Sequence, residues 1–121
     1  MPNTKLKSPR AVRVRIRFSL EIRGSRQSFR GEAIDLSVDG LCFRSPILLV
    51  EGERAGASLL FPGAPPIPLS FEVRWVRPDG PSHYRTGVEF VHSAESRKSF
   101  QKLLWQIESG ALRGAAGKGD A

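Results

Sequence analysis

Apolar and polar residues alternate along much of the chain, and this period of two is typical of strands with one buried and one exposed face. The longest run has apolar residues at every second position from Val14 to Ile22. Clusters of glycine and proline separate the runs, so each run predicts a strand that ends in a turn or loop. We predict six strands, over residues 14–22, 27–37, 41–43, 57–61, 69–76 and 84–90.

The last regular segment follows a helical period instead. Ser93 is suited to be the N-cap of a helix that continues to Ser109, and Gly110 is suited to end it. Trp105 lies off the apolar stripe of this helix. The stripe consists of Phe100, Leu103, Leu104 and Ile107.

Six short strands with turns between them favour an antiparallel barrel, because closure is the usual way to leave no strand edge exposed. The apolar stripe of the helix would then cover one opening of the barrel. The sequence therefore predicts an all-β fold, a six-stranded antiparallel barrel with a C-terminal α-helix.

Two alternating runs meet at a polar turn over residues 34–43. Asp39-Gly40 is a pair that readily adopts positive φ in a two-residue hairpin turn. Asp35 and Ser37 are held at the end of the first strand, and a glycine beside them would let a ligand approach the backbone. A structural hairpin is the simpler interpretation of these residues by themselves.

Length and composition indicate one domain with ordinary globular character. The 121 residues are 40% hydrophobic and 26% charged. No apolar run approaches the roughly 18 to 20 residues that span a bilayer, and the N-terminal residues lack the apolar segment of a secretory signal. The single Cys42 allows no internal disulfide. We therefore expect a cytoplasmic protein without membrane insertion.

The net charge of +7 is concentrated near the start of the chain. Residues 1–30 contain nine Lys or Arg and one acid, whereas the remaining residues are close to neutral. Seven of these nine cations are arginine, which suits bidentate contacts with phosphate and guanine. The sequence therefore predicts an anionic partner at one place on the molecule.

Catalytic and metal-binding patterns are absent from the sequence. His83 and His92 lie at opposite ends of one predicted strand, and no Cys/His cluster has metal-ligand spacing. Neither a Gly-x-Ser-x-Gly elbow nor a phosphate-binding P-loop occurs. We therefore expect no catalytic residues, no metal and no cofactor.

The polar turn carries a resemblance to a known family. Asp35-x-Ser37-x-x-Gly40 resembles the D/N-x-S-x-x-G motif of PilZ domains, which are receptors for the bacterial second messenger cyclic di-GMP. An arginine-rich segment precedes the first strand, as the R-x-x-x-R motif of that family does. Residues 87–90 resemble its last strand, and the resemblance covers roughly residues 8–107.

The resemblance implies a site for cyclic di-GMP. Asp35 and Ser37 would contact a guanine and its sugar and phosphate, Gly40 would allow the close approach, and arginines would hold the ligand from the other side. The residues implied as ligand-binding are Arg10, Arg13, Arg17, Asp35, Ser37 and Gly40.

The arginine motif is displaced from its usual place. Arg13 and Arg17 have the R-x-x-x-R spacing, but Arg17 falls inside the first strand, where a solvated strand face is the simpler interpretation of Arg15 and Arg17. If the strand is aligned instead, Arg13 becomes the second arginine. Pro9 then lies four residues earlier, and Arg10 is one place away.

The resemblance implies a non-catalytic receptor that binds cyclic di-GMP and passes the signal to an unknown effector protein. We expect a flexible basic arm over residues 1–9, a PilZ-like domain over 10–109 and a disordered tail over 110–121.

Two alternatives stay open. One is an adaptor that has lost the nucleotide and acts through protein contacts in motility or signalling. The other is a nucleic-acid-binding barrel, for which the basic arm is suggestive. Alternation places Phe71, Trp75 and Phe90 on inward positions, so no base-stacking platform is predicted, and we expect no specific nucleic acid.

Overall fold

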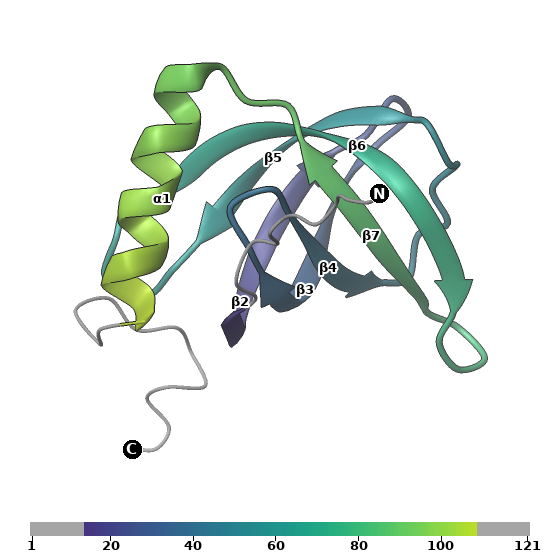
Figure 1. Ribbon diagram of the computed structural model, residues 1–121. Helices are drawn as coiled ribbons and strands as arrows, with labels where there is room; N and C mark the ends of the chain where they lie inside the picture. The colour runs from purple at the N-terminus through teal and green to yellow at the C-terminus, as the bar shows by residue number, and fades with distance from the viewer. Residues whose placement is uncertain (1–13, 109–121) are drawn as a thin grey trace, which may run out of the picture.

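The computed structural model describes residues 14–108, in which six strands close into a barrel and one helix packs against its end (Figure 1). The elements are β2 (Val14–Arg23), β3 (Ser28–Leu36), β4 (Gly40–Ser45), β5 (Arg54–Leu60), β6 (Ile67–Pro78), β7 (Tyr84–Phe90) and α1 (Ala94–Glu108). Around the barrel the order is β2-β3-β4-β7-β6-β5, with every neighbouring pair antiparallel. The predicted fold class is confirmed.

Three strands are at least two residues longer than alternation predicts: β4 extends over Gly40–Ser45 rather than 41–43, and β5 and β6 are also longer. β5 begins at Arg54 rather than at Ala57, because main-chain pairing with β6 starts early. The Val73 N–H donates to the Glu53 C=O at 2.8 Å, just before the first residue of β5. β6 extends at both ends beyond the predicted run over 69–76. Main-chain hydrogen bonds therefore set these strand ends.

The core consists of the inward side chains at alternate positions of the strands. Phe43 and Phe71 are fully buried, with ring centroids 6.0 Å apart. Phe18 packs on Phe61, with ring centroids 4.4 Å apart. These tilted rings dominate the interior, because aromatic side chains bury the largest apolar area.

α1 contributes the predicted apolar stripe to this core. Phe100, Leu104 and Ile107 are buried, and the ring of Phe100 meets that of Phe90 edge-on at 5.0 Å. Trp105 is 65% exposed, which confirms that it lies off the stripe. Within residues 14–108 no helix is long and apolar enough to cross a lipid bilayer.

The start of α1 is capped and tied to the barrel. Ser93 is the predicted N-cap: its Oγ accepts the Ser96 N–H at 3.1 Å, and Ser96 Oγ accepts the Ser93 N–H at 3.0 Å. One residue earlier, His92 Nε2 donates to the Val38 C=O at 2.9 Å. The helix is thereby linked to the turn between β3 and β4.

β6 contains a bulge that reverses its two faces. Val73 pairs with Val88, but Trp75 pairs with Gly87, so Arg74 is an extra residue on β6. An inserted residue moves every following side chain to the other face. Val76 therefore packs against the core, and Trp75 lies on the outer surface. The predicted inward position of Trp75 is wrong, whereas the other two aromatics, at 71 and 90, are buried as predicted.

Candidate functional site

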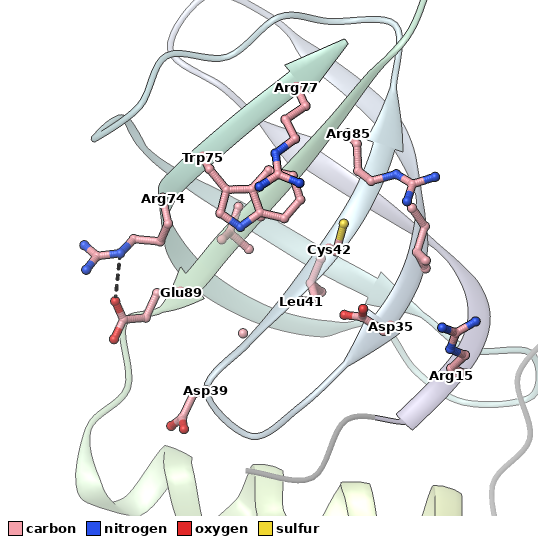
Figure 2. Close-up of a pocket in the computed structure, with 14 residues that line it drawn as sticks. Arg15, Asp35, Asp39, Leu41, Cys42, Arg74, Trp75, Arg77, Arg85 and Glu89 are labelled. Carbon is pink, nitrogen blue, oxygen red and sulfur yellow. Dashed lines mark ion pairs between the residues drawn. The ribbon is translucent and has the colours of Figure 1, made fainter. Parts of the chain in front are cut away.

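A row of outward positions crosses five strands of the barrel and forms the floor of a cleft (Figure 2). Each residue in the row is the register partner of the next one. The cleft has a volume of about 710 Å³, a size typical of small-molecule sites. In order across β2, β3, β4, β7 and β6, the row is Arg15, Asp35, Cys42, Gly87 and Trp75.

The middle of this row is low and its ends are high. Cys42 is buried and its side chain is small, so the floor is depressed at this position, between Asp35 on one side and Trp75 on the other. A ligand bound across the depression would meet a carboxylate on one side and an aromatic ring on the other.

Trp75 lies flat against the strand beside it. A Cβ on Gly87 would overlap the indole, so the ring occupies the space above this glycine. The guanidinium carbon of Arg77 lies over the ring, 4.7 Å from its centroid (Figure 2). The adjacent apolar pair Trp75-Val76 is the sequence signal for this arrangement, because two neighbouring strand residues cannot both face the core.

A second outward row supplies positive charge along one side of the cleft. Arg44, Arg85 and Arg77 are successive register partners across β4, β7 and β6. Asp79 Oδ2 accepts from Arg44 Nε at 3.0 Å and from Arg85 Nη2 at 3.4 Å. Arg77 has no ion pair among the described residues. This row therefore retains net positive charge beside the floor of the cleft.

The basic side continues into a neighbouring cleft of about 460 Å³. Arg15 and Arg85 line both clefts, and Arg17 lines only the second one. In the described part of the chain neither Arg15 nor Arg17 forms an ion pair, so both keep their full charge for an anion. Guanidinium groups at such a surface are suited to phosphate.

The opposite side of the cleft is acidic but neutralised. Arg74 Nε pairs with Glu89 Oε1 at 3.2 Å, as Figure 2 shows. Asp39 extends toward α1, where its Oδ1 lies 2.9 Å from Arg97 Nη2. Both carboxylates lie beside the row that forms the floor, whereas Asp35 is a member of that row.

Ser37 is buried inside the turn and does not line the cleft. It is 3% exposed, and its Oγ accepts the N–H of Asp39 at 3.3 Å and of Gly40 at 3.2 Å. The Ser37 N–H donates to the Gly40 C=O at 2.8 Å. The hydroxyl thus fixes the backbone that follows Asp35.

Gly40 lines the cleft, but its backbone differs from the prediction. The described glycines with positive φ are Gly52, Gly63 and Gly80, so the predicted positive-φ turn at Asp39-Gly40 is wrong. Gly40 is instead the first residue of β4. A Cβ there would overlap the Val88 carbonyl oxygen, so close contact between β4 and β7 is what requires glycine.

The structure brings only part of the predicted set together. Asp35 and Gly40 line the cleft, Arg17 lines the neighbouring one, and Ser37 supports the turn. Arg10 and Arg13 lie outside the described residues, as do the predicted arm and tail. Sequence reasoning missed four cleft residues, Arg15, Trp75, Arg77 and Arg85, and took Arg15 for a solvated strand face.

The described residues contain no arrangement of side chains typical of a metal site. No group of three or more His, Cys, Asp and Glu residues within 14–108 is placed to hold a metal ion. The described cleft instead combines guanidinium groups, one aromatic ring and, in its floor, the Asp35 carboxylate. These groups recognise phosphate, a flat base and N–H donors, respectively.

Comparison with known proteins connects this barrel to one family. The sequence model described as "PilZ domain" matches residues 7–106. No protein with a curated description matches the chain.

Several solved structures share the fold. The PilZ domain of Escherichia coli YcgR with c-di-GMP has a TM-score of 0.71 at 16% identity, over 87% of this chain and 95% of that one. MotI/DgrA, the Bacillus subtilis inhibitor of motility, has a TM-score of 0.63 at 15% identity, over 82% of this chain and 52% of that one. The K. pneumonia MrkH–c-di-GMP complex has a TM-score of 0.70 at 16% identity, over 88% of this chain and 54% of that one. The chain therefore spans about half the length of MotI and MrkH.

Proposed function

The chain belongs to the PilZ domain family, and on this premise we propose that it is a receptor for cyclic di-GMP that performs no catalysis. The observation that carries the proposal is the row from Arg15 through Asp35 to Trp75, flanked by arginines. The bound nucleotide in the YcgR and MrkH structures supports the choice of ligand.

The chemistry of the ligand matches the groups in the cleft. Cyclic di-GMP contains two guanines and two phosphates. The Asp35 carboxylate is an acceptor for the N1 and N2 hydrogens of a guanine, and the Trp75 indole is a surface on which the same base can stack. Arg15 and Arg85, which line both this cleft and the neighbouring one, are donors for the phosphates.

Two predicted residues act through the backbone in this proposal. Ser37 holds the turn so that Asp35 keeps its place at the strand end, and Gly40 allows β4 to lie close against β7. Each is a positioning residue, because neither offers a polar side-chain atom to the cleft.

The N-terminal arginines would complete the site. Arg10 and Arg13 precede β2, whose Arg15 already lies in the row. We propose that they cover the ligand from outside, with Arg17 at the second cleft, and that this change presents a new surface to an effector protein. Charge-assisted contacts to phosphate and guanine would offset the ordering cost of about 1 to 2 kcal/mol per residue.

The test is a calorimetric titration of cyclic di-GMP into the wild-type chain and three variants. Asp35→Ala should weaken binding roughly tenfold to a hundredfold, because hydrogen bonds to a charged group contribute about 1.5 to 3 kcal/mol. Arg13→Ala should weaken it in the same direction. Glu51→Gln, which removes an exposed carboxylate from the β4–β5 loop, is the matched control and should bind like wild type.

Two results would contradict this function. If the wild-type chain binds no cyclic di-GMP, the adaptor that acts through protein contacts becomes the better description. If Asp35→Ala binds as tightly as Glu51→Gln while both keep the wild-type circular dichroism spectrum, the nucleotide binds elsewhere.

A further inference from the structure

The indole of Trp75 is already covered in the free protein. One of its faces lies against Gly87, because a Cβ at that position would overlap the ring. The guanidinium of Arg77 lies over the ring at 4.7 Å and therefore on the other face, the one turned toward the cleft (Figure 2). A base that stacks on Trp75 must take the place that Arg77 occupies.

Among residues 14–108, the indole is the only polar or aromatic partner of the Arg77 guanidinium. The Arg77 side chain is exposed, and it forms no ion pair with any described residue, whereas its neighbours Arg44 and Arg85 share Asp79. It lies two residues after Trp75 on the same strand, so its side chain can fold back over the indole. The contact is thus a cation–π contact at an exposed site, the weaker kind.

A nucleobase has the advantage in this competition. Stacking of a base on an aromatic side chain is stronger than an exposed cation–π contact. The released guanidinium then gains a phosphate if the ligand carries one beside the base, and gains nothing if the ligand is neutral. The exchange therefore favours phosphorylated ligands over free nucleosides.

We propose that Arg77 is a displaceable occupant of a base subsite on Trp75, and that it moves from the indole to a ligand phosphate when a base stacks. This inference rests on the proposed function, since it describes how the same cleft selects a nucleotide. It makes Arg77 a specificity-determining residue with two opposed effects. The side chain opposes stacking of a neutral base and assists binding of an anionic one.

The experiment compares guanosine with cyclic di-GMP on Arg77→Ala. All variants carry Trp105→Phe, which removes the exposed tryptophan of α1 and leaves Trp75 as the only one in the chain. Titrations followed by Trp75 fluorescence and by calorimetry give both affinities. Arg54→Ala, another exposed strand arginine with a side-chain ion pair outside the cleft, is the matched control.

The expected signature is a change of opposite sign for the two ligands. Arg77→Ala should bind guanosine about two- to fivefold more tightly, since the cation–π contact no longer has to be broken. It should bind cyclic di-GMP at least threefold more weakly, since the phosphate loses a charge-assisted donor. In a Trp75→Leu background, Arg77→Ala should leave guanosine affinity unchanged.

Each other outcome overturns a named part of the idea. Weaker binding of both ligands by Arg77→Ala would mean that the base stacks on the guanidinium itself, and unchanged binding of both would mean that Arg77 has no part. If the wild type does not bind cyclic di-GMP while Arg77→Ala still raises the affinity for guanosine, the receptor function is wrong and the base subsite on Trp75 is supported. If no variant binds either ligand, both fail.

Discussion

Gly40 and Gly87 lie on the neighbouring strands β4 and β7, but glycine is required at the two positions for different reasons. The carbonyl oxygen of Val88 occupies the space where Gly40 would carry a Cβ, and a backbone atom in a strand pair cannot move aside. At Gly87 the space is taken by the end of a side chain, the Trp75 indole, which can rotate away. Gly40 is therefore needed for the pairing of β4 with β7, whereas Gly87 is needed for the position of the Trp75 indole in the cleft.

This difference predicts two separable phenotypes. Gly40→Ala should lower the free energy of unfolding by about 2 to 4 kcal/mol, because it forces β4 away from β7. Gly87→Ala should change stability by less than about 1 kcal/mol but displace the indole, which weakens cyclic di-GMP binding roughly tenfold or more. Urea denaturation and calorimetry on both variants measure the two quantities. Equal stability losses would show that the indole is as fixed as the backbone.

Thr86 is a second residue with a local cost. It is fully buried, and its Oγ1 has no hydrogen-bond partner among the described residues. A buried hydroxyl without a partner opposes folding, so Thr86→Val should raise the free energy of unfolding by on the order of 1 kcal/mol. Ser45→Ala is the contrasting control.

The control variant, Ser45→Ala, should instead lower the free energy of unfolding. Ser45 is equally buried, but its hydroxyl donates to the Ile47 C=O at 3.2 Å and accepts the Ile47 N–H at 3.3 Å. Its removal should cost about 1 kcal/mol. A loss of stability in Thr86→Val, measured in the same urea titrations, would mean that the threonine hydroxyl is satisfied in solution.

At the scale of elements, α1 is coupled to the turn that follows Asp35. His92 Nε2 bonds to Val38 and Arg97 pairs with Asp39, so two contacts join the turn to the beginning of the helix. Fraying of the first helical turn would therefore loosen both. The cap at Ser93 is the contact that prevents fraying.

Ser93→Ala should lower the free energy of unfolding by about 1 kcal/mol, since it removes the acceptor for the Ser96 N–H. Ser99→Ala, at an exposed position inside the same helix, should be neutral or slightly stabilising because alanine has the higher helix propensity. Hydrogen exchange at the amides of residues 37–40 should speed up in Ser93→Ala alone. Equal exchange in both variants would show that the turn is held without the helix.

The limits of sequence reasoning are also clearest at this scale. Alternation found all six strands, and the stripe from Phe100 to Ile107 found the helix, because each pattern reflects which side chains face the core. The bulge at Arg74 was invisible to a strict period of two, so Trp75 was assigned to the wrong face. The position of β7 between β4 and β6 comes from pairing between distant segments, and only that pairing places Trp75 in one row with Asp35.

At the scale of the whole molecule, charge separates the two nucleotide classes that a basic barrel can bind. The net charge is +7, and the arginines that contribute to it include several on this face of β2, β4, β6 and β7. A single-stranded oligonucleotide would bind such a surface mainly through phosphates, each of which releases counterions. Cyclic di-GMP has only two phosphates and would draw on the carboxylate and the ring as well.

The two ligands should therefore respond differently to salt. The affinity for an oligonucleotide should fall with a log–log slope of about −0.7 for each phosphate neutralised. The affinity for cyclic di-GMP should fall much less, because stacking on Trp75 and hydrogen bonds to Asp35 release no counterions. Titrations of both ligands over a series of salt concentrations give the two slopes, with Asp35→Ala as the variant that should weaken only the cyclic dinucleotide. A steep slope for cyclic di-GMP, or an oligonucleotide that displaces it at physiological salt, would mean that the row across the barrel contributes charge and little recognition.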